Sequence, residues 1–88
     1  METIRIDLAR LKTQEEALRR FKSITGMPGQ YTGELSELHD ILKNYENPLK
    51  IEIVIGGNIS PFTGLMEMLE DVRISNDKLL FVVIMHVA

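Results

Sequence analysis

Several features that define common classes of protein are missing from this chain of 88 residues. It contains no cysteine, which excludes disulfide bonds and zinc sites built on cysteine. Its longest apolar run, residues 79–85, is too short to cross a bilayer, so we expect no contact with a membrane. The chain begins with a strand pattern rather than a basic and apolar leader, which favours a cytoplasmic location.

Motifs of catalysis and cofactor binding are also missing. The sequence has no GxGxxG motif, no P-loop and no pair of histidines at metal-binding spacing. His39 and Asp40 are adjacent, so on a helix their side chains point about 100° apart and form a poor catalytic pair. His86 falls in an apolar strand pattern and is interpreted as structural. We therefore predict a protein that is not an enzyme and needs no metal or cofactor.

The composition that remains is that of a small globular domain spanning residues 1–88. Hydrophobic residues make up 44% of the chain, and the net charge is −3. Residues 1–30 contain six Lys/Arg and four Asp/Glu, a balance of +2, whereas residues 31–88 contain four and nine, a balance of −5. An acidic surface disfavours direct binding of nucleic acid and suits a basic protein partner.

Hydrophobic periodicity predicts three strands separated by helices. Residues 2–8 alternate between apolar and polar, which indicates a half-buried strand near a sheet edge. Residues 49–55 and 78–87 form the second and third strands, the last almost uniformly apolar. Strands that alternate with helices favour parallel pairing through right-handed crossovers. The predicted fold is a two-layer α/β domain, in which a three-stranded parallel sheet packs against three or four helices.

The first and third helices have clear start signals. Thr13 is expected to cap the first helix in a capping box with Glu16, and Gly26 to take the left-handed conformation after its end. Ser60 followed by proline starts the third helix. The predicted buried positions of these two helices are Ala17, Leu18, Phe21 and Ile24, then Leu65, Met68, Leu69 and Val72.

The stretch between these helices is the most informative part of the chain. Apolar residues recur at helical spacing from Leu35 to Tyr45 and predict a helix over residues 34–44, capped by Thr32 or Gly33. Ser36 and Asp40 share its polar face with Glu37. Tyr31 precedes the helix and Tyr45 follows it, and tyrosine is enriched at interfaces. The residues alone leave two interpretations open, a solvated face with tyrosines in the core or an acidic face that enters a basic cleft.

A resemblance bears on this choice. The run Pro28-Gly-Gln-Tyr, followed by Leu35-Ser-Glu-Leu-His-Asp-Ile-Leu and then by Pro48-Leu49, resembles the barstar family of intracellular inhibitors of bacterial ribonucleases. The resemblance implies a barstar-like fold with strand order 1-2-3, although the apolarity of residues 78–87 alone favours a central third strand. It also implies that the helix and its leading loop block the active site of a basic, extracellular-type ribonuclease. Asp40 matches the aspartate that takes the place of a substrate phosphate.

The resemblance also has departures, and they leave the partner open. Ser36 replaces an aspartate, Glu34 an asparagine and Thr32 a glycine of the family pattern. The predicted partner-binding residues are Gln30, Tyr31, Glu34, Ser36, Glu37, His39, Asp40, Lys43 and Tyr45. We expect a monomer that inhibits a ribonuclease one-to-one. The alternatives are a barstar-like module with a non-nuclease partner and a domain that binds phosphate at the Gly-Gly-Asn turn, residues 56–58.

Overall fold

Three parallel strands form one sheet in the order β1-β2-β3 in a computed structural model of the chain, which describes residues 1–85. The strands are β1 (Glu2–Asp7), β2 (Leu49–Ile55) and β3 (Leu79–Met85). The observed order agrees with the one that the resemblance implies. The central position favoured by the apolarity of the third strand is wrong, because β2 lies between the other two.

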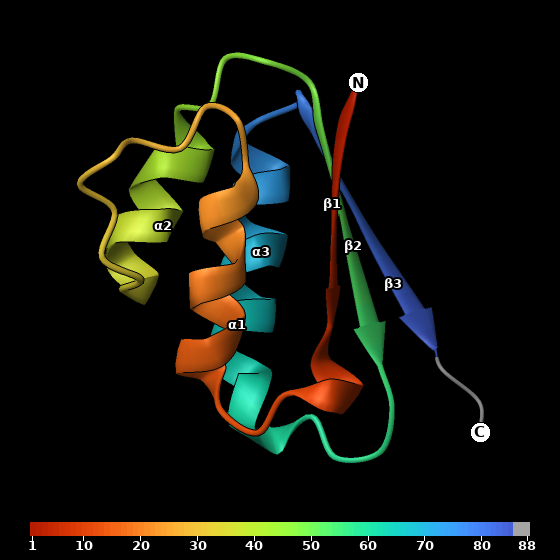
Figure 1. Cartoon of the computed structure of the whole chain (residues 1–88). Helices are drawn as coiled ribbons and strands as arrows, with labels where there is room; N and C mark the ends of the chain where they lie inside the picture. The colour runs from red at the N-terminus through yellow and green to blue at the C-terminus, as the bar shows by residue number, and fades with distance from the viewer. Residues whose placement is uncertain (86–88) are drawn as a thin grey trace.

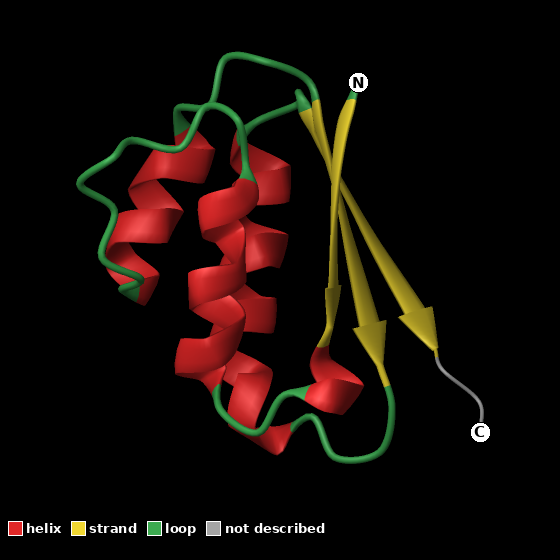
Figure 2. Cartoon of the chain, in the orientation of Figure 1, coloured by secondary structure: helices red, strands yellow, loops and turns green. Residues whose placement is uncertain are grey.

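All three α-helices lie on the same side of this sheet, and Figure 2 shows the sheet layer and the helix layer. The helices are α1 (Gln14–Arg20), α2 (Leu35–Lys43) and α3 (Thr63–Ser75), with short 3₁₀ turns η1 (Leu8–Arg10), η2 (Phe21–Ser23) and η3 (Ser60–Phe62). Helix α2 packs on α3. It lies at the side of the molecule opposite β3, with α1 and α3 between them (Figure 1). The predicted two-layer α/β fold is therefore confirmed.

The core lies between the sheet and the helices, where alternating strand residues meet the helical stripes. Ile6, Ile51 and Ile53 are each at most 1% exposed and form the floor of this core. Every apolar position predicted for the first and third helices is buried, and Phe62, Leu38 and Leu42 complete the packing. Fully burying one such side chain stabilises the fold by about 1.5–3 kcal/mol, so this layer supplies most of the driving force.

The ends of the first helix differ in part from their prediction. Thr13 caps α1 as expected, since its hydroxyl accepts from the backbone N–H of Glu16 at 3.3 Å. The left-handed conformation expected at Gly26 is wrong, because Gly33 and Gly57 are the glycines with positive φ among residues 1–85. Gly26 is required for a different reason: a Cβ atom there would lie 2.8 Å from the ring of Tyr45.

The strand ends also shift by small amounts. Leu8 was expected in the first strand but begins η1, because the Asp7 carboxylate accepts from the Ala9 N–H at 3.0 Å and turns the chain. The second strand spans residues 49–55 as predicted. The third begins at Leu79 rather than Lys78, and the last two residues predicted for it, His86 and Val87, lie outside the described residues.

Candidate functional site

Helix α2 presents one buried face and one polar face. Leu38 and Leu42 are 0% exposed and fix the helix on the core. Their neighbours Ser36, Asp40 and Lys43 are exposed. The apolar stripe predicted for this helix is thus confirmed, and its polar side faces solvent as a single surface.

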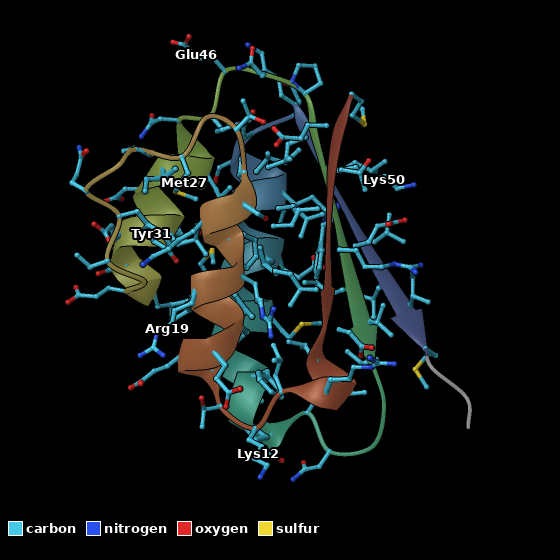
Figure 3. All side chains as sticks on the ribbon, viewed as in Figure 1. Lys12, Arg19, Met27, Tyr31, Glu46 and Lys50 are labelled. Carbon is cyan, nitrogen blue, oxygen red and sulfur yellow. The ribbon has the colours of Figure 1, made fainter. Side chains whose placement is uncertain are left out.

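The loop that leads into α2 is held by Tyr31. This side chain is only 4% exposed, and its hydroxyl donates to the carbonyl oxygen of Leu18 on α1 at 2.7 Å. Burial raises the pKa of Tyr31 to about 12, with a smaller contribution from the nearby Glu37 carboxylate. Figure 3 shows Tyr31 between the loop and the helices. Tyr31 was expected to contact a partner, but here it anchors the loop from inside.

The start of α2 is fixed by a carboxylate rather than by the predicted cap. Glu34 is the N-cap residue and its side chain makes no capping hydrogen bond, so the expected cap at Thr32 or Gly33 is wrong. Instead Glu37 Oε1 accepts from Thr32 N at 2.8 Å and from Thr32 Oγ1 at 3.0 Å. These bonds, led by the one from the Thr32 N–H, lower the pKa of Glu37. The leading loop is thereby tied to the first turn of the helix.

The end of α2 depends on Asn76, a residue that sequence reasoning placed in a plain turn. Asn76 is 9% exposed, and its Nδ2 donates to the carbonyl oxygens of Leu42 at 3.0 Å and Tyr45 at 2.9 Å. It therefore supplies a donor to the Tyr45 carbonyl oxygen and a second donor to the Leu42 carbonyl oxygen, which also accepts from the Tyr45 N–H at 3.2 Å. The only signal in the sequence was an asparagine directly after an apolar helical stripe, which is also typical of an ordinary turn.

Tyr45 joins the exit loop to the first strand. Its hydroxyl donates to Glu2 Oε1 at 3.1 Å and accepts from the Gly26 N–H at 3.2 Å. Burial raises the pKa of Tyr45, and the hydrogen bond to Glu2 adds to this effect. Hydrogen bonds from Thr25, above all the one from its backbone N–H, lower the pKa of Glu2. Tyr45 is 8% exposed. Like Tyr31, it was expected at the partner surface but lies in the core. It supports the site by fixing the exit loop of α2 to Glu2 and Gly26.

The exposed acidic centre of the surface is Asp40. Its side chain is 81% exposed, and within residues 1–85 no lysine or arginine forms an ion pair with it. His39 lies beside it, with Nδ1 at 3.7 Å from Asp40 Oδ1, while His39 Nε2 is 2.7 Å from Asp71 Oδ2 on α3. The imidazole thus bridges α2 and α3, a contact that the sequence did not predict. Asp40 remains available for a basic group of another protein.

A small hollow borders Asp40 on the α3 side. Its volume is about 360 Å³, and Leu35, Ser36, His39, Asp40 and Met68 line it. Its lining combines the apolar side chains of Leu35 and Met68 with three polar ones, a combination suited to one protruding side chain of a partner. Of the other predicted site residues, Gln30, Glu34 and Lys43 are exposed around α2. The structure therefore gathers seven of the nine predicted residues on or beside the α2 surface and turns the two tyrosines inward.

The glycine-rich turn after β2 has a structural explanation. Gly57 adopts a φ of +68°, and Asn58 Oδ1 accepts from the Ser60 N–H at 3.0 Å. The asparagine thus uses its side chain to start η3. Within residues 1–85, no three acidic or histidine side chains are grouped as a metal ion would require.

None of the helices in the described part of the chain is both long and apolar enough to cross a membrane. The chain matches no protein-family model and no curated protein.

Proposed function

We propose that this protein is an intracellular inhibitor that blocks the active site of a basic, extracellular-type ribonuclease. Helix α2 and the loop before it enter the nuclease cleft, one chain per enzyme. The Asp40 carboxylate occupies the position of a substrate phosphate among cationic side chains of the enzyme. The inhibitor itself catalyses no reaction and binds no nucleic acid.

The observation that carries this proposal is the state of Asp40. A carboxylate that is 81% exposed on a fixed helix, without an internal lysine or arginine, is ready to accept charge-assisted hydrogen bonds. Such bonds are strongest when they become desolvated at the centre of an interface. The internal hydrogen bonds of Tyr31, Glu37 and Asn76 hold the surrounding backbone in place, so little ordering is needed on binding.

Inhibition assays of a basic microbial ribonuclease test the proposal. We expect one equivalent of the protein to abolish activity, and association to slow as salt rises. Asp40→Ala should weaken inhibition by at least about 30-fold, because truncating one side of a buried charge pair costs about 2–5 kcal/mol. Asp77→Ala removes the same charge from an exposed turn and is the matched control. Equal behaviour of the two variants, or no inhibition of any such enzyme, would contradict the proposal.

A second function rests on the departures around Asp40. Position 36 is a serine, and the Glu37 carboxylate is used by Thr32, so the surface has fewer free acids than the family pattern. This favours a protein partner other than a ribonuclease that binds the same α2 surface. Affinity capture from the source cell distinguishes the two: a non-nuclease protein that binds the wild type but not Asp40→Ala supports the second function.

A further inference from the structure

The two edges of the sheet differ in charge. Strand β1 carries Glu2, Arg5 and Asp7 among its six residues, whereas Leu79–Met85 of β3 contains no charged side chain. Charges on an edge strand oppose pairing with another chain, because pairing would remove them from water. The β1 edge is therefore protected by its charges against pairing with another chain, and the β3 edge is not.

Strand β3 also exposes apolar side chains on both faces. Leu80 is 46% exposed on the outer face, in one row with Lys50, which points away from the helices in Figure 3. Val83 and Met85, which point to the helical face by strand alternation, are 42% and 69% exposed. Val82 and Ile84 extend the outer row. A contiguous apolar strip beside backbone groups that pair with no other strand of residues 1–85 is a typical site of strand addition.

We propose that β3 pairs antiparallel with β3 of a second copy of this chain, around a two-fold axis at Val82. The two sheets then join into one of six strands. In this register Leu79 lies opposite Met85, Leu80 opposite Ile84, Phe81 opposite Val83, and Val82 opposite itself. Each pair joins side chains from the same face of the sheet, so the apolar strip of one copy continues into that of the other.

Charge distribution favours a second copy as the occupant. Because β3 is neutral, self-pairing places no like charges opposite each other, whereas a charged strand would find no counter-charge on Leu79–Met85. The acidic α2 surface lies at the opposite side of the molecule, so the two copies keep these surfaces far apart (Figure 1). The edges left free are the charged β1 strands, so assembly ends at two copies.

The proposed dimer is an alternative to the monomer expected from the sequence, and it does not depend on the ribonuclease proposal. Each copy keeps its α2 surface free, so inhibition would still need one chain per enzyme. Sedimentation velocity over a concentration series should show a monomer–dimer equilibrium. A protein that stays monomeric at every concentration, as it would if β3 binds only an unrelated chain, or one that forms growing aggregates, would overturn the inference.

Val82→Lys tests the register. Glu52 lies beside Val82 on the neighbouring strand, so the new ammonium group is tolerated in the single copy. In the dimer two such groups face each other, and the dissociation constant should rise at least about tenfold. Thr3→Lys adds the same charge to the same face at the β1 edge and should leave the dimer intact. If Thr3→Lys dissociates the dimer and Val82→Lys does not, β3 is not the interface.

Cross-linking gives a second readout that does not depend on a destabilising charge. The chain has no cysteine, so Val82→Cys introduces a single thiol in each copy. Directly opposed residues of an antiparallel pair have Cβ atoms about 4.5–5.5 Å apart, within reach of a short thiol-to-thiol linker. Val82→Cys should therefore cross-link efficiently and Thr3→Cys should not. Equal cross-linking of the two variants would overturn the proposed pairing.

Discussion

The α2 surface and the β3 edge differ in how far the chain completes its own hydrogen bonding. Around α2, Tyr31, Glu37 and Asn76 place the backbone through internal bonds, and Asp40 is left exposed on a fixed helix. At β3, one side of the backbone faces no strand of the described sheet, and the side chains around it are apolar. The first surface is thus held rigid by internal bonds, as the proposed inhibition requires, whereas the second has the open edge that the proposed strand pairing requires.

The largest effect is expected at Asn76, which precedes β3 in the chain and holds the end of α2. Asn76→Ala removes two buried hydrogen bonds, which leaves the Tyr45 carbonyl oxygen without its side-chain donor and the Leu42 carbonyl oxygen with the Tyr45 N–H alone. This loss should lower the free energy of unfolding by about 2–4 kcal/mol. Asn44 Nδ2 also donates to a helix carbonyl, that of Asp40 at 2.9 Å, but at an exposed site. Asn44→Ala should therefore cost less than about 0.5 kcal/mol. Urea denaturation of both variants measures the difference, and equal costs would show that Asn76 does not fasten α2.

Gly26→Ala should destabilise the contacts around Tyr45 at the end of α2 and leave the β3 edge unchanged. The added methyl group would lie 2.8 Å from the Tyr45 ring, so the ring must move, at a cost of about 1–3 kcal/mol. Gly29→Ala meets no atom within 4 Å and should change stability by less than about 1 kcal/mol. Thermal unfolding compares the two, and sedimentation of Gly26→Ala should show an unchanged dimer. Loss of the dimer in this variant would mean that the two regions are not independent.

A smaller effect is expected at Tyr31. Tyr31→Phe removes the hydrogen bond to Leu18 and should lower stability by about 1 kcal/mol at neutral pH. The pKa of Tyr31 is raised from 10.0 to about 12, so the folded state holds this proton more tightly than the unfolded state. Stability should therefore be intact below pH 10 and fall as pH rises toward 12. Urea denaturation at alkaline pH should show a shallower fall for Tyr31→Phe, and an identical fall would contradict this role.

The smallest effect concerns acid pH. The Thr32 N–H lowers the pKa of Glu37 below its ordinary 4.5, so the folded state favours the ionised carboxylate. The contribution is present above pH 4.5 and is lost as pH falls through the lowered pKa. Glu37→Gln should reduce the loss of stability on acidification, whereas Glu67→Gln, at an exposed position of α3, should not. A matched set of urea denaturation curves between neutral and acid pH tests this contrast.

Much of the fold could be predicted from the sequence, because its signals are local. The alternation in β1 and β2, the Thr13 cap and the stripes of α1 and α3 each depend on residues a few positions apart. The central position that apolarity favoured for the third strand was wrong, because a local signal does not report the order of the strands in the sheet. High apolarity is typical of a central strand, but it also occurs where an edge strand exposes apolar side chains.

The site was less predictable, because its supports join residues far apart in the chain. The sequence identified α2 and its polar face, but it could not show that Tyr45 reaches Glu2 or that Asn76 reaches Leu42. Both tyrosines have an apolar ring and a polar tip, so the same residue fits an interface or a core with a buried acceptor. Only the fold decides between these positions, and it places both hydroxyls on internal partners.

The most direct measurement of the central claim is the inhibition constant of Asp40→Asn against a basic ribonuclease. Asparagine keeps the size of the side chain and a hydrogen-bond acceptor but loses the charge. If Asp40 replaces a phosphate, the variant should fold normally and bind at least about 30-fold more weakly than the wild type. Inhibition by Asp40→Asn equal to that of the wild type would contradict phosphate mimicry.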